Sequence, residues 1–173
     1  MGILKRILFD FIYPEKEKCF ICGKDILLSE VPFLCSDCLA GLSYTSQICS
    51  ICGREIGVLK GEKSSKNGVK KDLKCEYCSA NNNNFHFEKN RSVFVYEKLG
   101  RDLIFNFKYF NKKELYKPLG ELLYIYFKEY YSKIDFDYIL PIPLYKGRQK
   151  ERGYNQAKLL AEVVAKKSGI KLG

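Results

Sequence analysis

The stretch "CFICGKDILLSEVPFLCSDC", residues 19–38, holds two C-x-x-C pairs separated by twelve residues. Two thiolates with two residues between them can reach one metal ion from a tight turn, and two such turns complete a tetrahedral four-sulfur site. Coordination by thiolates alone favours zinc. A closed site of this kind has no open coordination position, so the pattern predicts a structural metal ion and not a catalytic one.

The same pattern occurs a second time in the chain. "CSICGR" at 49–54 echoes "CFICGK" at 19–24, a second pair follows each of them, and all eight cysteines stand in four pairs. The glycine after each leading pair, Gly23 and Gly53, suits a turn that needs a positive φ. The repeat predicts two structural zinc ions with sequential pairing, one held by Cys19, Cys22, Cys35 and Cys38 and the other by Cys49, Cys52, Cys75 and Cys78. An interleaved pairing stays open, because spacing alone does not exclude it.

The composition predicts a basic, globular protein. The chain of 173 residues is 46% hydrophobic and 14% aromatic, and 30 Lys and Arg against 20 Asp and Glu give a formal charge of +10. Two zinc ions bound by eight thiolates would lower that charge to roughly +6. The remaining positive charge favours anionic partners such as phosphate compounds or nucleic acid. No export signal is visible, so we expect a reducing, cytoplasmic location.

Three polar or amphipathic segments surround the cysteine pairs. Residues 1–18 place apolar residues at helical spacing, which predicts a short amphipathic helix packed on the protein, with a membrane-surface anchor as the alternative and no transmembrane segment. The insert 59–74 carries six lysines and is expected to be a solvated loop, with a phosphate-binding finger as the alternative. The polar run 79–84 ends the zinc module, which we place at 19–84, before a second region at 85–173.

The second region has the pattern of an α/β domain. We expect a strand at 91–98, helices at 101–110 and 115–131, and an apolar strand at 136–144 that is buried on both faces. Another helix follows from about Asn155 to Ser168, and "SGIKLG" leads from it into the next strand. The lone histidine, His86, is given no role.

A basic segment, residues 144–156, connects that apolar strand to the last helix and contains Arg148 and Arg152. In open α/β sheets ligands bind beyond the carboxyl ends of the strands, where loops lead into helix N-termini. Backbone donors around Gly153 and Tyr154, the helix dipole and arginine forks would suit a phosphate or pyrophosphate group. A solvated basic loop explains the composition equally well.

Taken together, the four cysteine pairs, "VFVYEKLGRDLIFNFKYFNKKEL" (93–115) and "DYILPIPLYKGRQKERGYNQAKLLAEVVA" (137–165) resemble the ComF family over nearly all of the chain. That resemblance implies a double zinc ribbon joined to a type I phosphoribosyltransferase-like domain. It also implies that the basic segment binds the pyrophosphate group of phosphoribosyl pyrophosphate, together with Mg²⁺, and that Lys108 faces the phosphate site. The most specific match is P-[IV]-P-L followed by R-x-x-x-R-G-[FY]-N-Q, which falls on Pro141, Pro143, Arg148, Arg152, Gly153, Tyr154, Asn155 and Gln156. Members of the family are linked to natural transformation and to the handling of imported single-stranded DNA.

The chain departs from that family in one respect. The paired acids and the Thr-Thr-Gly-like loop that would hold the ribose phosphate are missing, and the only threonine is Thr45. We therefore expect an N-terminal double zinc ribbon, a small metal-stabilised β module, followed by an incomplete α/β domain from a truncated chain that is inactive alone. The alternatives are a zinc-ribbon module that binds nucleic acid and a protein-interaction scaffold among DNA-uptake proteins.

Overall fold

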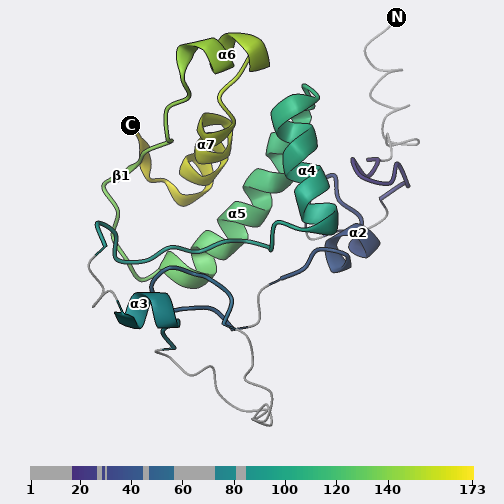
Figure 1. Ribbon diagram of the computed structural model, residues 1–173. Coiled ribbons are helices and arrows are strands. Elements are labelled where there is room, and N and C mark those ends of the chain that lie inside the picture. The colour runs from purple at the N-terminus through teal and green to yellow at the C-terminus, as the bar shows by residue number, and fades with distance from the viewer. Residues whose placement is uncertain (1–16, 27–28, 30, 45–46, 57–72, 81–84) are drawn as a thin grey trace, which may run out of the picture.

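A computed structural model describes residues 17–26, 29, 31–44, 47–56, 73–80 and 85–173 (Figure 1). The helix predicted for 1–18 lies almost entirely outside the described residues. The same holds for most of the lysine-rich insert and for the end of the polar run at 81–84.

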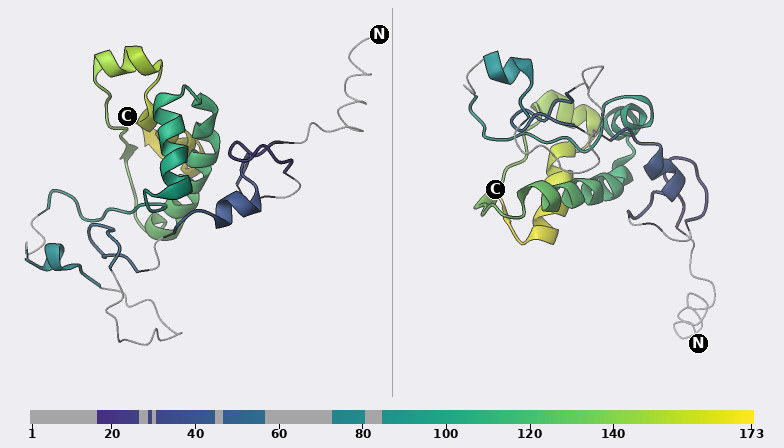
Figure 2. Two further views of the ribbon diagram at one scale, coloured as in Figure 1. Left: turned by 45° about the vertical axis from the view of Figure 1, so that its right-hand side comes forward. Right: turned by 90° about the horizontal axis from the view of Figure 1, so that it is seen from below.

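The zinc module consists of two short units with the same local structure. Each unit has one antiparallel bridge, Lys18 with Asp25 and Ile48 with Glu55, and each ends in a short helix, α2 (Ser36–Ala40) or α3 (Glu76–Ala80). Within the described residues the β structure of the module is limited to these bridges, which is less than a ribbon of strands would give. The two units lie apart, with α2 beside α4 and α3 towards the C-terminal end of α5 (Figures 1 and 2).

Two helices follow, close to the predicted positions. They are α4 (Lys98–Tyr109) and α5 (Tyr116–Tyr131), joined through the 3₁₀ turn η1 (Lys113–Leu115). Leu103 and Phe107, one turn apart, form the buried side of α4. Pro118 lies in the first turn of α5, where its missing N–H has no helical partner to lose.

The strand predicted for 91–98 is absent. Residues 91–97 have no regular structure, Lys98 begins α4, and the backbone bonds of the segment are local or reach the zinc module, as in the bond from Val95 N–H to the Ser43 carbonyl at 2.8 Å. Val93, Phe94 and Leu99 instead pack against the core. The β-prone residues therefore supply apolar contacts, and within the described chain no neighbouring strand pairs with them.

The C-terminal part is a β-α-β unit. Strand β1 (Tyr138–Ile139) leads through α6 (Lys146–Arg152) and α7 (Gln156–Ser168) to β2 (Lys171–Leu172). The strands are parallel, with Tyr138 opposite Lys171 and Ile139 opposite Leu172. The parallel crossover agrees with an α/β pattern. The predicted burial of 136–144 is wrong for the structure described, because Leu140 and Ile142 are 74% and 80% exposed.

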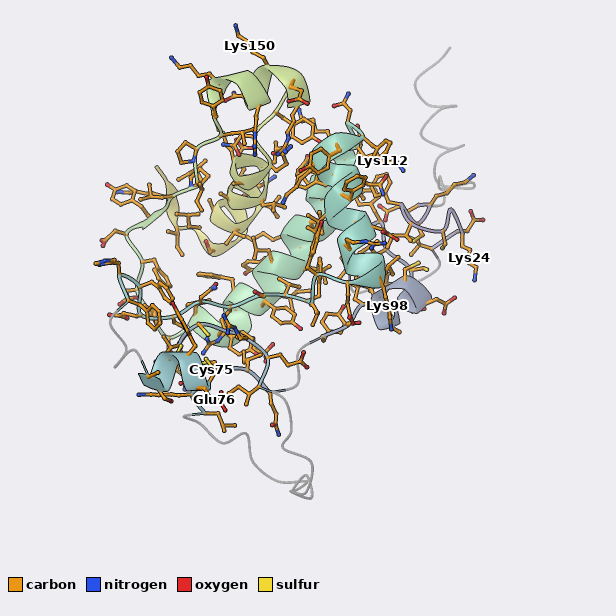
Figure 3. All side chains as sticks on the ribbon, viewed as in Figure 1. Lys24, Cys75, Glu76, Lys98, Lys112 and Lys150 are labelled. Carbon is orange, nitrogen blue, oxygen red and sulfur yellow. The ribbon has the colours of Figure 1, made fainter. Side chains whose placement is uncertain are left out.

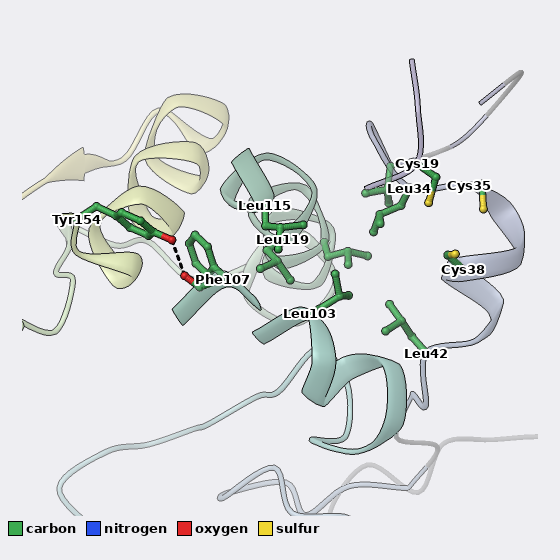
Figure 4. Close-up of a cluster of buried hydrophobic side chains, with 12 residues drawn as sticks. Cys19, Leu34, Cys35, Cys38, Leu42, Leu103, Phe107, Leu115, Leu119 and Tyr154 are labelled. Carbon is green, nitrogen blue, oxygen red and sulfur yellow. Dashed lines mark hydrogen bonds between the residues drawn. The ribbon is translucent and has the colours of Figure 1, made fainter. Parts of the chain in front are cut away.

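One hydrophobic core crosses the border between the zinc module and the helices (Figure 4). It contains Leu34 and Leu42 from the first unit and Leu103 and Leu119 from α4 and α5. Helix α7 packs along α5, and Lys167 on α7 forms an ion pair with Glu121 on α5 at 2.6 Å. Among the described residues no helix is long and apolar enough to cross a membrane.

Candidate functional site

The four thiols of the first unit come together at one point. Cys19 and Cys22 lie in the leading turn, Cys35 is the N-cap residue of α2, and Cys38 lies within that helix. Their sulfur atoms all lie within 4.8 Å of one another, and the Sγ atoms of Cys22 and Cys35 are 3.6 Å apart. Four sulfurs at 2.3 Å from a zinc ion would be separated by about 3.8 Å, so the donor set fits a tetrahedral zinc site.

The second unit repeats this arrangement. Cys49, Cys52, Cys75 and Cys78 form the second group, with Sγ of Cys52 and Sγ of Cys75 3.7 Å apart. The N–H of Cys75 also donates to Sγ of Cys49 at 3.4 Å, as expected around a thiolate ligand. The grouping agrees with the sequential pairing predicted from the repeat, and the interleaved alternative does not occur. Both groups consist of thiols alone, which fits structural zinc.

Local hydrogen bonds prepare one thiol in each group for metal binding. Burial raises the pKa of Cys19, but donors from Cys22, Cys35 and Ile21 outweigh it and lower the pKa to about 6. In the second group, burial likewise raises the pKa of Cys49, and backbone donors lower it to about 6. One ligand of each site is therefore ionised near neutral pH before the metal arrives.

The last thiol of each group behaves in the opposite way. Burial raises the pKa of Cys78 to about 12, and burial also raises the pKa of Cys38. Because zinc binds thiolates, these two side chains release protons when the metal binds.

The two glycine turns differ in their surroundings. Gly23 and Gly53 both have positive φ, 72° and 67°, as the sequence predicts. A β-carbon on Gly23 would meet nothing within 4 Å, whereas one on Gly53 would lie 2.5 Å from the carbonyl oxygen of Asn90. The second turn is thus held closely against the segment that leads into the helices.

Arg91 connects that second turn to α5. Its guanidinium donates to the carbonyls of Cys49 at 3.3 Å and Ser50 at 2.9 Å, and its Cζ lies 5.4 Å from the ring centre of Tyr130. Sequence reasoning missed this residue, because nothing in its local pattern marks a contact 42 residues away.

The structure divides the basic segment between a helix and a turn. Arg148 lies exposed on α6, which also carries Lys150 pointing outward (Figure 3). Gly153 ends α6 with φ 75°, and its N–H donates to the carbonyl of Gln149. That amide, predicted as a phosphate donor, is used within the chain in this conformation.

The start of α7 is capped by a side chain of the basic segment. Asn155 caps the helix, and its Oδ1 accepts from the N–H groups of Ala157 and Lys158 at 2.9 and 3.3 Å. Gln156 follows, 7% exposed, with its Nε2 buried and without a partner among the described residues. Its Oε1 accepts from Arg152 Nη1 at 3.3 Å.

Arg152 is held from two sides and comes close to α4. Besides its bond to Gln156, its guanidinium lies 4.9 Å from the ring centre of Tyr109. Tyr109 follows Lys108 at the end of α4, so the structure brings the Lys108 region near the basic segment. Tyr154 makes the same connection from the inside, since its hydroxyl donates to the Phe107 carbonyl at 2.6 Å (Figure 4). The side chain of Tyr154 is buried in the core and faces away from solvent.

Three exposed aromatic residues near Arg152 were not predicted. Phe105, Tyr109 and Phe110 are 45%, 58% and 62% exposed. The four-residue spacing of the first two was a usable signal that sequence reasoning did not use.

The comparisons with known proteins agree with the cysteine geometry. Residues 8–80 match the family model described as "Double zinc ribbon domain". The chain is 31% identical over 137 residues to the curated protein "Competence protein ComFC" of Bacillus subtilis (strain 168), an alignment that covers 78% of this chain and 52% of the relative. The chain thus spans about half the length of that relative. No solved structure matches.

Proposed function

The chain belongs to the ComF family, and on that premise we propose that it acts in competence by binding phosphoribosyl pyrophosphate through the basic segment. In this proposal the zinc module is a rigid support and the basic segment is the ligand site. A complete site would transfer ribose 5-phosphate to an acceptor, as the bond from C1 to the pyrophosphate breaks and pyrophosphate leaves. The described residues contain no group assigned to the ribose phosphate, so this chain alone is expected to be inactive. In this proposal Mg²⁺ accompanies the bound phosphoribosyl pyrophosphate, and the protein acts in the cytoplasm.

The observation that carries the proposal is the position of Arg152. Its guanidinium lies between the Tyr109 ring and Oε1 of Gln156, the first residue of α7. A pre-oriented arginine loses less freedom when it binds an anion, and the positive end of the helix dipole favours negative charge at this place. The Nε2 of Gln156, beside it, is buried and has no partner among the residues that the structure describes. Arg148 on α6 and Lys108 on α4 supply further positive charge.

The proposal is tested by calorimetric titration of the zinc-loaded chain with phosphoribosyl pyrophosphate in the presence of Mg²⁺. Arg152→Ala should weaken binding roughly tenfold to a hundredfold, the range for a charge-assisted hydrogen bond of about 1.5–3 kcal/mol. Arg101→Ala is the matched control, because Arg101 is an exposed arginine on α4 that pairs with Asp102. Absence of binding by the unchanged chain contradicts the proposal.

A second candidate is binding of single-stranded nucleic acid by the second zinc unit together with the aromatic residues that follow it. Tyr77, Phe85 and Phe87 form consecutive ring contacts at 5.9 and 5.2 Å, and the Arg54 guanidinium lies 5.5 Å from the Tyr77 ring centre. Bases stack on exposed aromatic rings next to positive charge. Binding of a thymidine oligonucleotide that falls steeply with salt and survives Arg152→Ala would favour this candidate. A chain that binds neither ligand would favour a protein-interaction scaffold.

A further inference from the structure

Three aromatic residues at the C-terminal end of α4 form a continuous exposed surface, which we call the aromatic patch. Phe105, Tyr109 and Phe110 are its members, and the ring centre of Phe105 lies 4.9 Å from that of Tyr109 and 5.6 Å from that of Phe110. About half of each side chain faces solvent. Phe107, between them in sequence, is only 1% exposed and serves the core, so the patch is not needed to attach α4.

One arginine contacts the aromatic patch, and three lysines flank its residues in sequence. The Arg152 guanidinium lies over the Tyr109 ring, Lys108 is exposed between the patch residues in sequence, and Lys112 and Lys113 follow Phe110. Two acids flank the patch in sequence: Asp102 is paired with Arg101 at 3.3 Å, and the exposed Glu114 follows Lys113 and lies near Tyr154. Apolar protein-protein contact surfaces are poor in lysine at their centre, whereas rings bordered by Lys and Arg suit an aromatic ligand that carries negative charge.

We propose that the aromatic patch stacks the base of a nucleoside diphosphate whose phosphate groups are held at Arg152. The proposal rests on the proposed function in that it uses the same anion site. Phosphoribosyl pyrophosphate and nucleoside diphosphates share the pyrophosphate group that the basic segment would recognise. Of these two ligands, only the nucleoside diphosphate carries a planar base, which could stack on the aromatic side chains of the patch. Gln156 lies at the same place: its Oε1 accepts from Arg152, and its Nε2 is buried without a partner among the described residues.

Calorimetric titrations of the zinc-loaded chain with inorganic pyrophosphate and with ADP test the proposal. ADP should bind roughly fivefold to a hundredfold more tightly than pyrophosphate, the range measured for stacking of one base on an aromatic ring. Phe105→Ala and Phe110→Ala should each remove much of this difference and leave pyrophosphate binding within about twofold. CDP should behave like ADP, because stacking tolerates every base.

The variants separate the patch from the anion site. Tyr109 is left unchanged because its ring holds Arg152. Tyr96→Ala is the matched control, since Tyr96 is 60% exposed and lies before the other end of α4. Phe110 lies just beyond the helix, so its variant keeps the test valid even when Phe105→Ala weakens α4.

Each outcome has one meaning. If phosphoribosyl pyrophosphate, pyrophosphate and ADP all fail to bind the unchanged chain, the proposed function fails and the patch proposal fails with it. If phosphoribosyl pyrophosphate binds and ADP does not, only the patch proposal is overturned. If pyrophosphate binds but ADP binds no more tightly, or if both patch variants weaken the two ligands equally, the patch proposal is overturned while the anion site stands. The patch proposal would also be overturned if Phe105→Ala weakened binding of a 5′-phosphorylated oligonucleotide but left binding of ADP unchanged.

Discussion

Tyr154 links the basic segment to the helices through one buried hydroxyl. The last carbonyls of a helix have no partner within it, and the Phe107 carbonyl near the end of α4 is one of these. The hydroxyl of Tyr154 satisfies it at 2.6 Å, and the two rings pack with their centres 5.7 Å apart. Burial, followed by the nearby Glu114 carboxylate, raises the pKa of Tyr154, so this donor stays protonated at neutral pH.

We expect Tyr154→Phe to reduce stability by about 1–2 kcal/mol, because it removes one hydrogen bond and leaves a buried carbonyl without a donor. Urea unfolding of the zinc-loaded chain, followed by circular dichroism, measures this change. Tyr124→Phe is the control, since the Tyr124 hydroxyl makes an exposed bond to the Lys167 carbonyl at 3.2 Å and its loss should cost less than about 0.5 kcal/mol. If both variants lost the same free energy of unfolding, the buried bond to Phe107 would contribute no more to stability than the exposed bond of Tyr124.

At this scale the sequence predicts residues with a strong local signal. The eight cysteines, the two glycine turns and the start of a helix near Asn155 follow from spacing and from residue type, because each needs only its near neighbours. Tyr154 and Arg91 act on partners 47 and 42 residues away. No local pattern contains such contacts, so sequence reasoning assigned Tyr154 to the ligand site and gave Arg91 no role.

At the scale of the elements, the helices with an apolar face were predictable and α6 was not. Helix α6 has no buried residue, so it lacks the periodicity by which α4, α5 and α7 were found. Its Lys, Arg, Gln and Glu residues are nevertheless good helix formers, and Gly153 supplies the left-handed end. The strand expected at 91–98 did not form, although its residues favour a strand. Strand pairing also needs a neighbouring strand, and the residue types of one segment do not show whether that neighbour is present.

Gly120 sets the distance between α5 and α7. A β-carbon at this position would lie 2.7 Å from both Cβ and Cγ2 of Val163. The side chain of Val163 is branched at Cβ, so these atoms lie close to the backbone of α7 and have little room to move. Alanine favours helix over glycine by about 1 kcal/mol. Forcing two packed helices apart costs up to about 3 kcal/mol, so we expect Gly120→Ala to destabilise the chain by about 2 kcal/mol net. Thermal unfolding measures the loss.

Two further variants make the Gly120 result specific. The Gly120→Ala/Val163→Ala double variant should be more stable than Gly120→Ala alone, because the smaller side chain makes room for the methyl group. Gly147→Ala on α6 would approach only the exposed ring of Tyr145, at 3.0 Å, and should leave stability unchanged or slightly higher. A stabilising effect of Gly120→Ala would contradict the close packing of α5 on α7.

For the whole molecule, the two zinc units make unequal contributions to the core. Cys19, Cys35 and Cys38 of the first unit belong to the same buried cluster as Leu103 and Leu119. The buried thiols of the second unit lie outside that cluster, and this unit reaches α5 through Arg91 and Tyr130. The boundary that the sequence suggests near residue 84 therefore separates two regions of different amino-acid composition. The hydrophobic core of the first unit nevertheless continues into the helices.

We therefore expect loss of the first zinc site to destabilise the helices more than loss of the second. Cys22 and Cys52 are the matched positions, because each ends a leading pair and neither belongs to the buried cluster. Each serine variant should lose one zinc ion by mass spectrometry of the native protein. Loss of the first zinc ion should reduce the free energy of unfolding by at least about 3 kcal/mol. Cys22→Ser should therefore lower the midpoint temperature of helix unfolding by roughly 6–12 °C, and Cys52→Ser by less than half as much. Equal shifts, or a larger shift for Cys52→Ser, would mean that the helices depend on the Arg91 contact at least as much as on the shared core.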